Sequence, residues 1–454
     1  MVFENAKSIW HSEEYGDNDY AEIVETVNYS GGEAILRVSV SGDYALFING
    51  EFAESNQFAD FPHYKVYDEI DITNRLKNGE NTVCLLAWYF GKSGMRYMTP
   101  TAGIIYEVEV DGKVILASSE NSLSRRSRVY KSGEIKRISY QFGYSFLYDA
   151  TKEDNWLLGN GTGFSTSKEM EKPTEFHKRP TKKLSLKEIE TGTITKTDNG
   201  YIIDLGKEIV GLPSFSVVSD TEQNINVAYG ELLESGHVKR FIGDRDFSFD
   251  YVAKQGENEF TSYMLRFACR YIEITAEKPF ASKSAGIIPQ VYEVTEKKIE
   301  ISNEIDKNIY EICLNTLKLC MMEHYVDCPW REQCLYAFDS RNQILSGYSA
   351  FRDGNFDYAR ANLLLMSKDR REDGLLSICF PSRDDLTIPS FSLYFILSVW
   401  EYMEKSGDLG LDGGPPAFPR RFLVSRGTPD TASSALFSPT WLSHSMAGLP
   451  MPFG

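Results

Sequence analysis

The chain has 454 residues, more than a single hydrophobic core usually organises, so roughly two to four domains are expected. Its formal net charge of −17 argues against nucleic acid and anionic membrane surfaces as partners, because both require clustered Lys and Arg. Hydrophobic residues make up 42% and charged residues 25%, as in ordinary globular proteins. The 13% aromatic content fits β-sandwich cores better than sugar-stacking surfaces alone.

Targeting and redox features predict a cytoplasmic protein. No apolar run reaches the roughly 18 residues of a membrane span, and residues 1–19 lack the basic and apolar regions of a signal peptide. The seven cysteines are odd in number and scattered, which is typical of free thiols. Cys328 and Cys334 lack the spacing and the nearby His of a zinc site, so no metal is predicted.

Residues 1–160 predict a β-sandwich of the jelly-roll type. Apolar and polar residues alternate over 34–40 and over 44–48, which is the period of half-buried strands. Asn49-Gly50 then gives a type I′ hairpin signal, and Asp111-Gly112 is a further turn. Short strands joined by regular turns are typical of β-sandwiches.

The next part of the chain predicts a linker followed by a second β-sandwich. Residues 161–183 are polar and contain two prolines, as in a linker or a loosely packed crossover. Strand patterns resume at 201–204 and continue through 271–274. We therefore expect the second β-sandwich over 184–295.

From residue 296 the apolar period changes from two to 3.6. Ile305, Ile309 and Ile312 begin one apolar stripe, with Ser302 as the expected N-cap. Further helical patterns lie near 335–351, 356–368 and 390–404. Successive helices after two β-units indicate a separate all-α domain.

The character of the chain changes again near residue 408. Residues 406–454 contain no Lys and no Glu, yet hold seven of the 17 prolines. This composition fits a disordered tail. We favour a shifted reading frame or an assembly fault over 408–454, because a domain of three or four helices would leave its inner face uncovered.

Candidate catalytic residues cluster between Asp327 and Asp339. Cys328 precedes a proline and is held extended, so Asp327 is expected in a loop, with Glu332 five residues on. Glycoside cleavage needs a protonated carboxylic acid and a second carboxylate. Apolar neighbours would raise the pKa of one carboxyl, while Arg331 would hold another ionised. A solvated, salt-bridged helix start explains the spacing as well, and spacing alone favours it.

The segment Asp327-Cys328-Pro329-Trp330-Arg331-Glu332-Gln333 resembles the acid-loop motif of α-L-rhamnosidases, glycoside hydrolase family 78. The family pattern continues to Gly-Trp-x-Gly-Asp, whereas residues 335–339 read Leu-Tyr-Ala-Phe-Asp and keep only the final acid. Other stretches up to about residue 407 also resemble the family, among them 44–50, 203–211, 267–272 and 402–408. The resemblance implies a galactose-binding-like jelly roll, a second β-sandwich, and a six-hairpin (α/α)6 barrel that is truncated and begins at 296–407.

The resemblance implies an inverting glycoside hydrolase that removes terminal α-L-rhamnose from glycosides or polysaccharides without a cofactor. Glu332 is the implied general acid, although some members carry that acid where this chain has Gln333. Asp327 and Arg331 would bind sugar hydroxyls, and Asp339 would support the acid or bind sugar. Tyr336 or Trp330 would supply a stacking surface for the sugar.

An inverting enzyme also needs a base on the opposite face of the sugar. The resemblance puts this base in the later barrel, which the chain does not resemble. Asp384 and Asp385 are assigned to a solvated turn rather than to that role, and His324 to a structural one. Two functions stay open, an active hydrolase and an inactive carbohydrate-binding fragment, with a purely structural sandwich protein as a third; the oligomeric state is not predicted.

Overall fold

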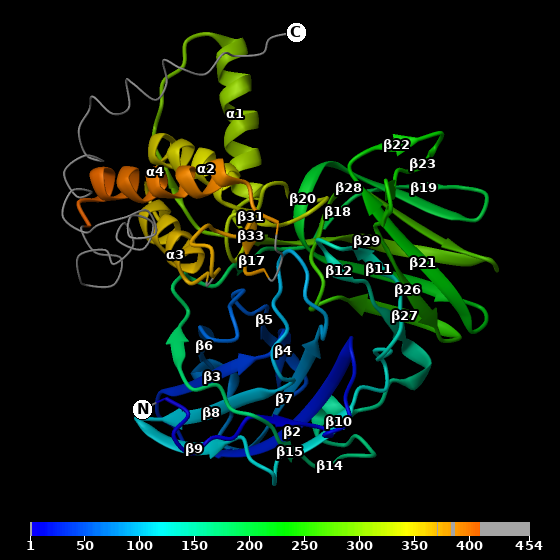
Figure 1. Cartoon of the computed structure of the whole chain (residues 1–454). Helices are drawn as coiled ribbons and strands as arrows, with labels where there is room; N and C mark the ends of the chain where they lie inside the picture. Colours follow the sequence, from blue (N-terminus) through cyan, green and yellow to red (C-terminus); the bar gives the residue numbers. More distant parts are fainter. Residues whose placement is uncertain (1, 370, 383–385, 409–454) are drawn as a thin grey trace.

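The computed structural model describes residues 2–369, 371–382 and 386–408 (Figure 1). The predicted atypical tail beyond Asp408 and the loop residues Asp384 and Asp385 lie outside the described residues. Figure 1 shows the N-terminal strands in blue and cyan below, the green strands of the second sandwich at the right, and the helices at the upper left. None of the described helices has the length and apolar content that a membrane crossing requires.

Two sheets form the N-terminal sandwich. One sheet has the order β15-β1-β8-β3-β6-β16 with β9 beside β8, and the other has the order β14-β10-β2-β7-β4-β5. Inward residues such as Leu36, Val38, Leu85 and Val108 are fully buried between the sheets, as their alternating pattern predicts. The strands are β1 (Ile9–Trp10), β2 (Asp19–Tyr29), β3 (Ala34–Val40), β4 (Asp43–Ile48), β5 (Glu51–Ser55), β6 (Lys65–Asp71), β7 (Gly79–Tyr89), β8 (Ile104–Val110), β9 (Lys113–Ala117), β10 (Leu123–Arg126), β14 (Ser165–Thr166), β15 (Lys168–Glu169) and β16 (Phe176–Lys178).

The predicted hairpin turns are confirmed, and the predicted linker contains strands. Asn49 and Gly50 have φ of 54° and 86° between β4 and β5, as a type I′ turn requires. Within 161–183, strands β14, β15 and β16 pair with β10, β1 and β6. A polar segment can do this because edge pairing uses backbone groups and needs no buried apolar side chain.

The second sandwich is built from one ten-stranded sheet with the path β13-β26-β21-β28-β20-β29-β17. Its longest strand, β20 (Gly200–Ser219), pairs with β28 through residues 200–211 and with β27 through residues 214–219, and its pairing with β28 shifts register between Asp204 and Ile209. The other strands are β13 (Leu147–Asp149), β17 (Ser185–Leu186), β18 (Glu190–Thr191), β19 (Thr193–Lys196), β21 (Gln223–Gly230), β26 (Ser248–Ala253), β27 (Gly256–Thr261), β28 (Phe267–Ala276) and β29 (Phe280–Val291).

Small two-stranded ladders border these sheets. They are β11 (Arg137–Ser139) with β12 (Gly143–Tyr144), β22 (Leu233–Glu234) with β23 (His237–Val238), and β24 (Phe241–Ile242) with β25 (Arg245–Asp246). Short 3-10 turns are η1 (Thr73–Arg75), η2 (Ala150–Lys152) and η3 (Trp156–Leu158). The β24–β25 hairpin is the ladder that reaches the candidate site.

Residues 296–408, the helical segment, contain four helices within their described part: α1 (Glu304–Leu319), α2 (Ala337–Ala350), α3 (Asn355–Ser367) and α4 (Pro389–Ser406). The segment is not purely helical, because β31 (Leu335–Tyr336) pairs with β33 (Cys379–Phe380), and β30 (Thr295–Glu296) pairs with β32 (Phe351–Asp353). The predicted N-cap Ser302 is wrong by one residue. Asn303 caps α1, since its side chain accepts the N–H groups of Ile305 and Asp306.

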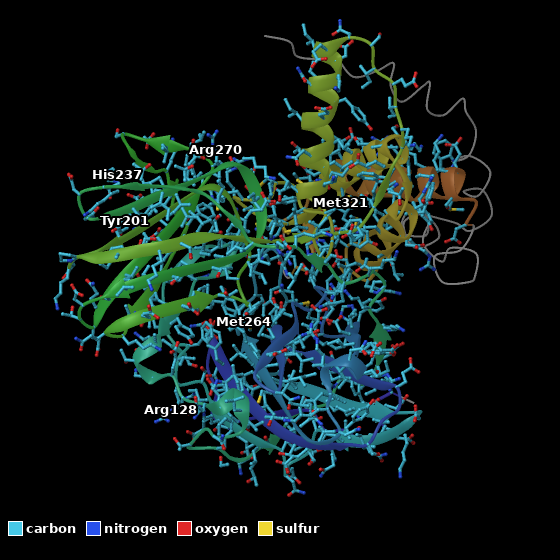
Figure 2. All side chains as sticks on the ribbon, turned by 180° about the vertical axis from the view of Figure 1, so that it is seen from behind. Arg128, Tyr201, His237, Met264, Arg270 and Met321 are labelled. Carbon is cyan, nitrogen blue, oxygen red and sulfur yellow. The ribbon has the colours of Figure 1, made fainter. Side chains whose placement is uncertain are left out.

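Two helices of this segment carry exposed apolar side chains. Ile305, Ile309 and Ile312 of α1 are 69%, 55% and 68% exposed, and Leu393 of α4 is 62% exposed. Helix α1 projects away from both β-sandwiches in the two opposite views (Figures 1 and 2). The apolar stripe that the sequence predicts on α1 therefore faces away from the described core.

Candidate active site

The acid loop runs from Asp327 to Cys334 and is closed by a pair of hydrogen bonds. The N–H of Asp327 donates to the Cys334 carbonyl at 2.9 Å, and the N–H of Cys334 donates to Oδ1 of Asp327 at 3.0 Å. Gln343 of α2 donates from Nε2 to the Val326 carbonyl at 2.6 Å, which ties the start of the loop to the next helix. The loop is therefore held at both ends, as a preorganised site requires.

Gln333 fixes the turn inside this loop. Its φ is 53°, in the left-handed region that side chains other than Gly seldom adopt. Its side chain compensates, because Nε2 donates to the Pro329 carbonyl at 2.7 Å and Oε1 accepts from the Arg96 guanidinium at 3.1 Å. The amide group of Gln333 is thus occupied by structural contacts.

Glu332 has a partner on each carboxylate oxygen. The Tyr336 hydroxyl donates to Oε2 at 2.7 Å, and Nη2 of Arg245 lies 3.3 Å from Oε1. The expected counter-ion Arg331 is exposed instead and forms no ion pair with the part of the chain that the structure describes. This expectation is wrong because the loop directs the Arg331 side chain to solvent, while the β24–β25 hairpin brings a different guanidinium to Glu332.

Asp327 and Asp339 lie close enough to Glu332 to sense its charge. Burial raises the pKa of Asp327, and the negative charge of Glu332 adds to that rise, against hydrogen bonds from Cys328 and Cys334 that lower it. Burial likewise raises the pKa of Asp339 in the first turn of α2, again with a contribution from Glu332. The charge of Glu332 thus acts on both of the other predicted carboxyl groups.

The two predicted stacking residues are placed differently from that expectation. The Trp330 side chain is 2% exposed and packs against Phe247 of the second sandwich, with ring centroids 4.9 Å apart. It therefore offers no ring face to a sugar, and its role here is packing. The Tyr336 ring is buried as well, and burial with the nearby Cys334 and Glu332 raises the pKa of its hydroxyl, which stays a hydrogen-bond donor.

The most informative residue that the sequence did not reveal is Arg245. The dipeptide Gly243-Asp244, between the apolar pair Phe241-Ile242 and the charged pair Arg245-Asp246, is a two-residue hairpin signal. The hairpin itself can therefore be recognised in the sequence. Its pairing with Glu332 spans 87 positions in the chain, and no local pattern encodes such a contact. Arg96, which supports Gln333, was hidden for the same reason.

Beside the loop, a cavity of about 110 Å³ lies where the two sandwiches meet the helical segment. Asp43, Arg96, Arg266, Glu323 and Gln333 are among the residues that line it. Within this lining Arg266 pairs with Glu323, and Arg96 donates to Gln333.

His324 lies at the same junction in the structural role that its position predicts. Its ring is buried, and Nδ1 lies 2.8 Å from the Tyr325 carbonyl oxygen. Burial lowers the pKa of His324 to about 4, so the ring is neutral near pH 7.

The geometry around Glu332 suits acid–base work on a polar substrate. Two half-buried carboxyl groups, Asp327 and Asp339, have raised pKa values, and Glu332 is oriented from two sides. No group of three or more His, Cys, Asp or Glu side chains among the described residues is arranged to hold a metal ion.

Comparison with known families covers the second sandwich and the helical segment. Residues 194–290 match the bacterial α-L-rhamnosidase concanavalin-like domain, and residues 296–411 match the bacterial α-L-rhamnosidase six-hairpin glycosidase domain. No curated protein sequence matches the chain.

Solved structures of α-L-rhamnosidases share the fold. The family 78 rhamnosidase of Bacillus sp. GL1 aligns with a TM-score of 0.78 at 17% identity, over 89% of this chain and 67% of that one. The enzyme of Dictyoglumus thermophilum gives 0.71 at 16% identity, over 88% and 50%. That of Streptomyces avermitilis, complexed with L-rhamnose, gives 0.68 at 15% identity, over 86% and 42%. The chain thus spans only about two thirds to two fifths of the length of these enzymes.

The fold and the acid loop define a class of protein in which β-sandwiches precede a six-hairpin glycosidase segment. Within that class, residues 194–290 and 296–411 match two successive domains of the rhamnosidase type. The chain therefore resembles α-L-rhamnosidases in these two domains, and it shares the fold of a glycoside hydrolase family 78 enzyme.

Proposed function

We propose that the protein is a glycoside hydrolase that removes terminal α-L-rhamnose from glycosides or polysaccharides with inversion of configuration. One observation carries the proposal: Glu332 is oriented by Tyr336 and Arg245 near two carboxyl groups of raised pKa, inside a segment of the rhamnosidase six-hairpin type. L-rhamnose bound to the Streptomyces avermitilis relative supports rhamnose as the sugar.

Within this proposal each side chain of the acid loop has a role. Glu332 donates the proton to the leaving oxygen. Asp339 supports Glu332 in this role because the negative charges of the two carboxyl groups act on each other. Asp327 and the exposed Arg331 bind sugar hydroxyls. Tyr336 orients Glu332 and does not stack on the sugar, and Trp330 is left out of the binding set because its ring is buried.

We further propose three modules and an incomplete barrel. The N-terminal module covers 1–160 together with the crossover 161–183, since the strands of the crossover pair with its sheets, except that β13 adds residues 147–149 to the sheet of the second sandwich. The second covers 184–295, and the helical segment 296–407 supplies the first helices of an (α/α)6 barrel. The general base would come from a later part of that barrel, opposite Glu332.

A second candidate function is favoured by the exposed faces of α1 and α4. In a helical barrel, further helices cover apolar helix faces of this kind. The exposed apolar residues on these faces are Ile305, Ile309, Ile312 and Leu393. Within residues 2–369, 371–382 and 386–408 these faces are uncovered and no base is assigned opposite Glu332, which supports a carbohydrate-binding protein without turnover.

One experiment separates the two candidates. The 454-residue protein is incubated with 4-nitrophenyl α-L-rhamnopyranoside, and binding of L-rhamnose is measured in parallel by calorimetry. Release of rhamnose with inverted anomeric configuration, followed by NMR, supports the hydrolase. Rhamnose binding without release supports the binding protein, and neither binding nor release contradicts both.

A further inference from the structure

The β24–β25 hairpin carries a guanidinium from the second sandwich to the acid loop. Arg245 is the first residue of β25, directly after the two-residue turn Gly243-Asp244, and its Nη2 lies 3.3 Å from Oε1 of Glu332. Both side chains are largely shielded from solvent, at 18% and 23% exposure. A shielded ion pair restrains the orientation of its partners more than an exposed pair does.

The base of the hairpin is anchored by Asp246. Oδ1 of Asp246 pairs with Nε of Arg240 at 3.2 Å, and Oδ2 pairs with Nζ of Lys136 at 3.1 Å. In the hairpin register Asp246 opposes Phe241, while Arg245 opposes Ile242. Because neighbouring side chains on a strand point to opposite faces, one face is tied down by Asp246 and the other presents Arg245.

The guanidinium of Arg245 is not fully paired by contacts within the second sandwich. Its Nε is buried and has no hydrogen-bond partner in the described part of the chain, and its only ion pair found there is with Glu332. On the other side of the carboxylate, the Tyr336 hydroxyl comes from β31, which pairs with β33 inside the helical segment. The two oxygens of Glu332 are therefore held by two different modules.

We infer that Arg245 is a positioning residue for Glu332, so that the second sandwich takes part in setting the orientation of the acid. The inference rests on the proposed function in so far as Glu332 is the general acid. Arg245 fixes Oε1 and Tyr336 fixes Oε2, and together they set the orientation of the carboxyl plane. Without Arg245 the side chain keeps one restraint and turns about the Tyr336 hydrogen bond.

The test uses the full chain with Arg245→Gln and Arg245→Lys, and Arg270→Gln as the matched control. Arg270 lies on the same sandwich (Figure 2) and pairs with Asp204 at 2.9 Å in an exposed setting. Crystal structures report the position of the Glu332 carboxylate. Hydrolysis is compared between an alkyl α-L-rhamnoside, whose leaving group needs a proton, and the 4-nitrophenyl α-L-rhamnoside, whose leaving group needs less help.

The expected structural result is a Glu332 carboxylate that is turned away in Arg245→Gln and restored in Arg245→Lys, with the Arg270→Gln control unchanged. The expected kinetic result is a loss of about 10- to 100-fold in kcat on the alkyl substrate, a smaller loss on the nitrophenyl substrate, and a KM that changes little. Partial recovery in Arg245→Lys follows because Lys supplies the charge but not the planar fork of donors.

Either of two results overturns the inference: a Glu332 carboxylate that does not move in Arg245→Gln, or equal losses on both substrates. If the unmodified chain releases no rhamnose, the proposed hydrolase function fails by itself. The crystal structures still decide the positioning role in that case, since they do not depend on turnover.

Discussion

Nη2 of Arg266 contacts both carboxylate oxygens of Glu323, at 2.7 Å to Oε1 and 2.6 Å to Oε2. Arg266 directly precedes β28 of the second sandwich, and Glu323 lies between α1 and the acid loop. Arg179 of the N-terminal crossover adds a guanidinium 3.9 Å from Oε1. Burial alone would raise the pKa of Glu323, but Arg266 and Arg179 outweigh it and lower the pKa. This ion cluster links all three parts of the molecule beside the acid loop.

Glu323→Gln is expected to destabilise the protein by about 3 kcal/mol, because it leaves the shielded guanidinium of Arg266 without its charge partner and removes the weaker of two carboxylates from Arg179, which keeps Asp68 at 3.0 Å. Urea unfolding measures the effect. Asp204→Asn, which breaks the exposed pair with Arg270, is the control and should cause no measurable change. Equal effects of the two substitutions would show that the buried cluster has no special weight.

Acidification is expected to weaken the fold through His324. Its folded-state pKa is about 4, whereas the unfolded-state value is about 6.5, so the unfolded chain binds more protons between these values. The free energy of unfolding should therefore fall as the pH drops from about 6.5 to 4, by roughly 3 kcal/mol from this group. His324→Asn should remove this part of the pH dependence in unfolding measured across that range.

His237 provides a control of opposite sign. Its ring lies 2.7 Å from Glu273, and the hydrogen bond and charge of Glu273 raise the pKa of His237. A raised folded-state pKa contributes stability below the unfolded value and loses it as the pH rises through the folded value. His237→Asn should therefore shift the pH dependence in the opposite direction from His324→Asn, and a shift in the same direction would contradict the assignment of both.

Glu332→Gln should abolish proton donation and spare sugar binding. We expect the rate on alkyl rhamnosides to fall by about 10²- to 10⁴-fold, the range that general acid catalysis usually contributes. L-rhamnose affinity, measured by calorimetry, should stay within a few fold. Glu277→Gln, at an exposed carboxylate between β28 and β29, is the matched control. Unchanged turnover in Glu332→Gln would remove Glu332 from the acid role.

Helix α1 offers a direct comparison of its two faces. Leu317 is 8% exposed and packs into the core of the helical segment, so Leu317→Ala should cost about 2–4 kcal/mol. Ile309 is 55% exposed, so Ile309→Ala should stay within about 0.5 kcal/mol. Denaturant unfolding measures both. A large loss in Ile309→Ala would mean that the exposed face is covered in solution.

Much of the fold followed from local patterns. Alternation placed β3 and β4, and Asn49-Gly50 placed the hairpin between β4 and β5, because period and turn chemistry act over a few residues. Local patterns predict a linker or a loosely packed crossover at 161–183, and they do not predict the short strands β14, β15 and β16 that this segment forms. Pairing at a sheet edge depends on where the partner strand lies, and no local pattern reports that.

The site was only half predictable. The motif from Asp327 to Asp339 named the three carboxyl residues that the structure gathers, since they lie within one loop and the helix that follows it. The counter-ion expected from the motif is wrong, because the guanidinium that contacts Glu332 belongs to Arg245 and not to Arg331. The motif also assigned a sugar-facing role to Trp330, whose ring the second sandwich covers.

The sequence by itself determined the β-sandwich character of the first 295 residues, the change to helices, and the acid-loop motif. Each of these depends on the spacing of residue types over short stretches of the chain. Only the tertiary structure decided how the modules meet, through the contacts of Arg245 with Glu332 and of Arg266 with Glu323. It also decided that the isoleucines of α1 are exposed. The physical reason is that charge pairing and burial depend on distances across the folded chain, and those distances are set by the packing of whole sheets and helices.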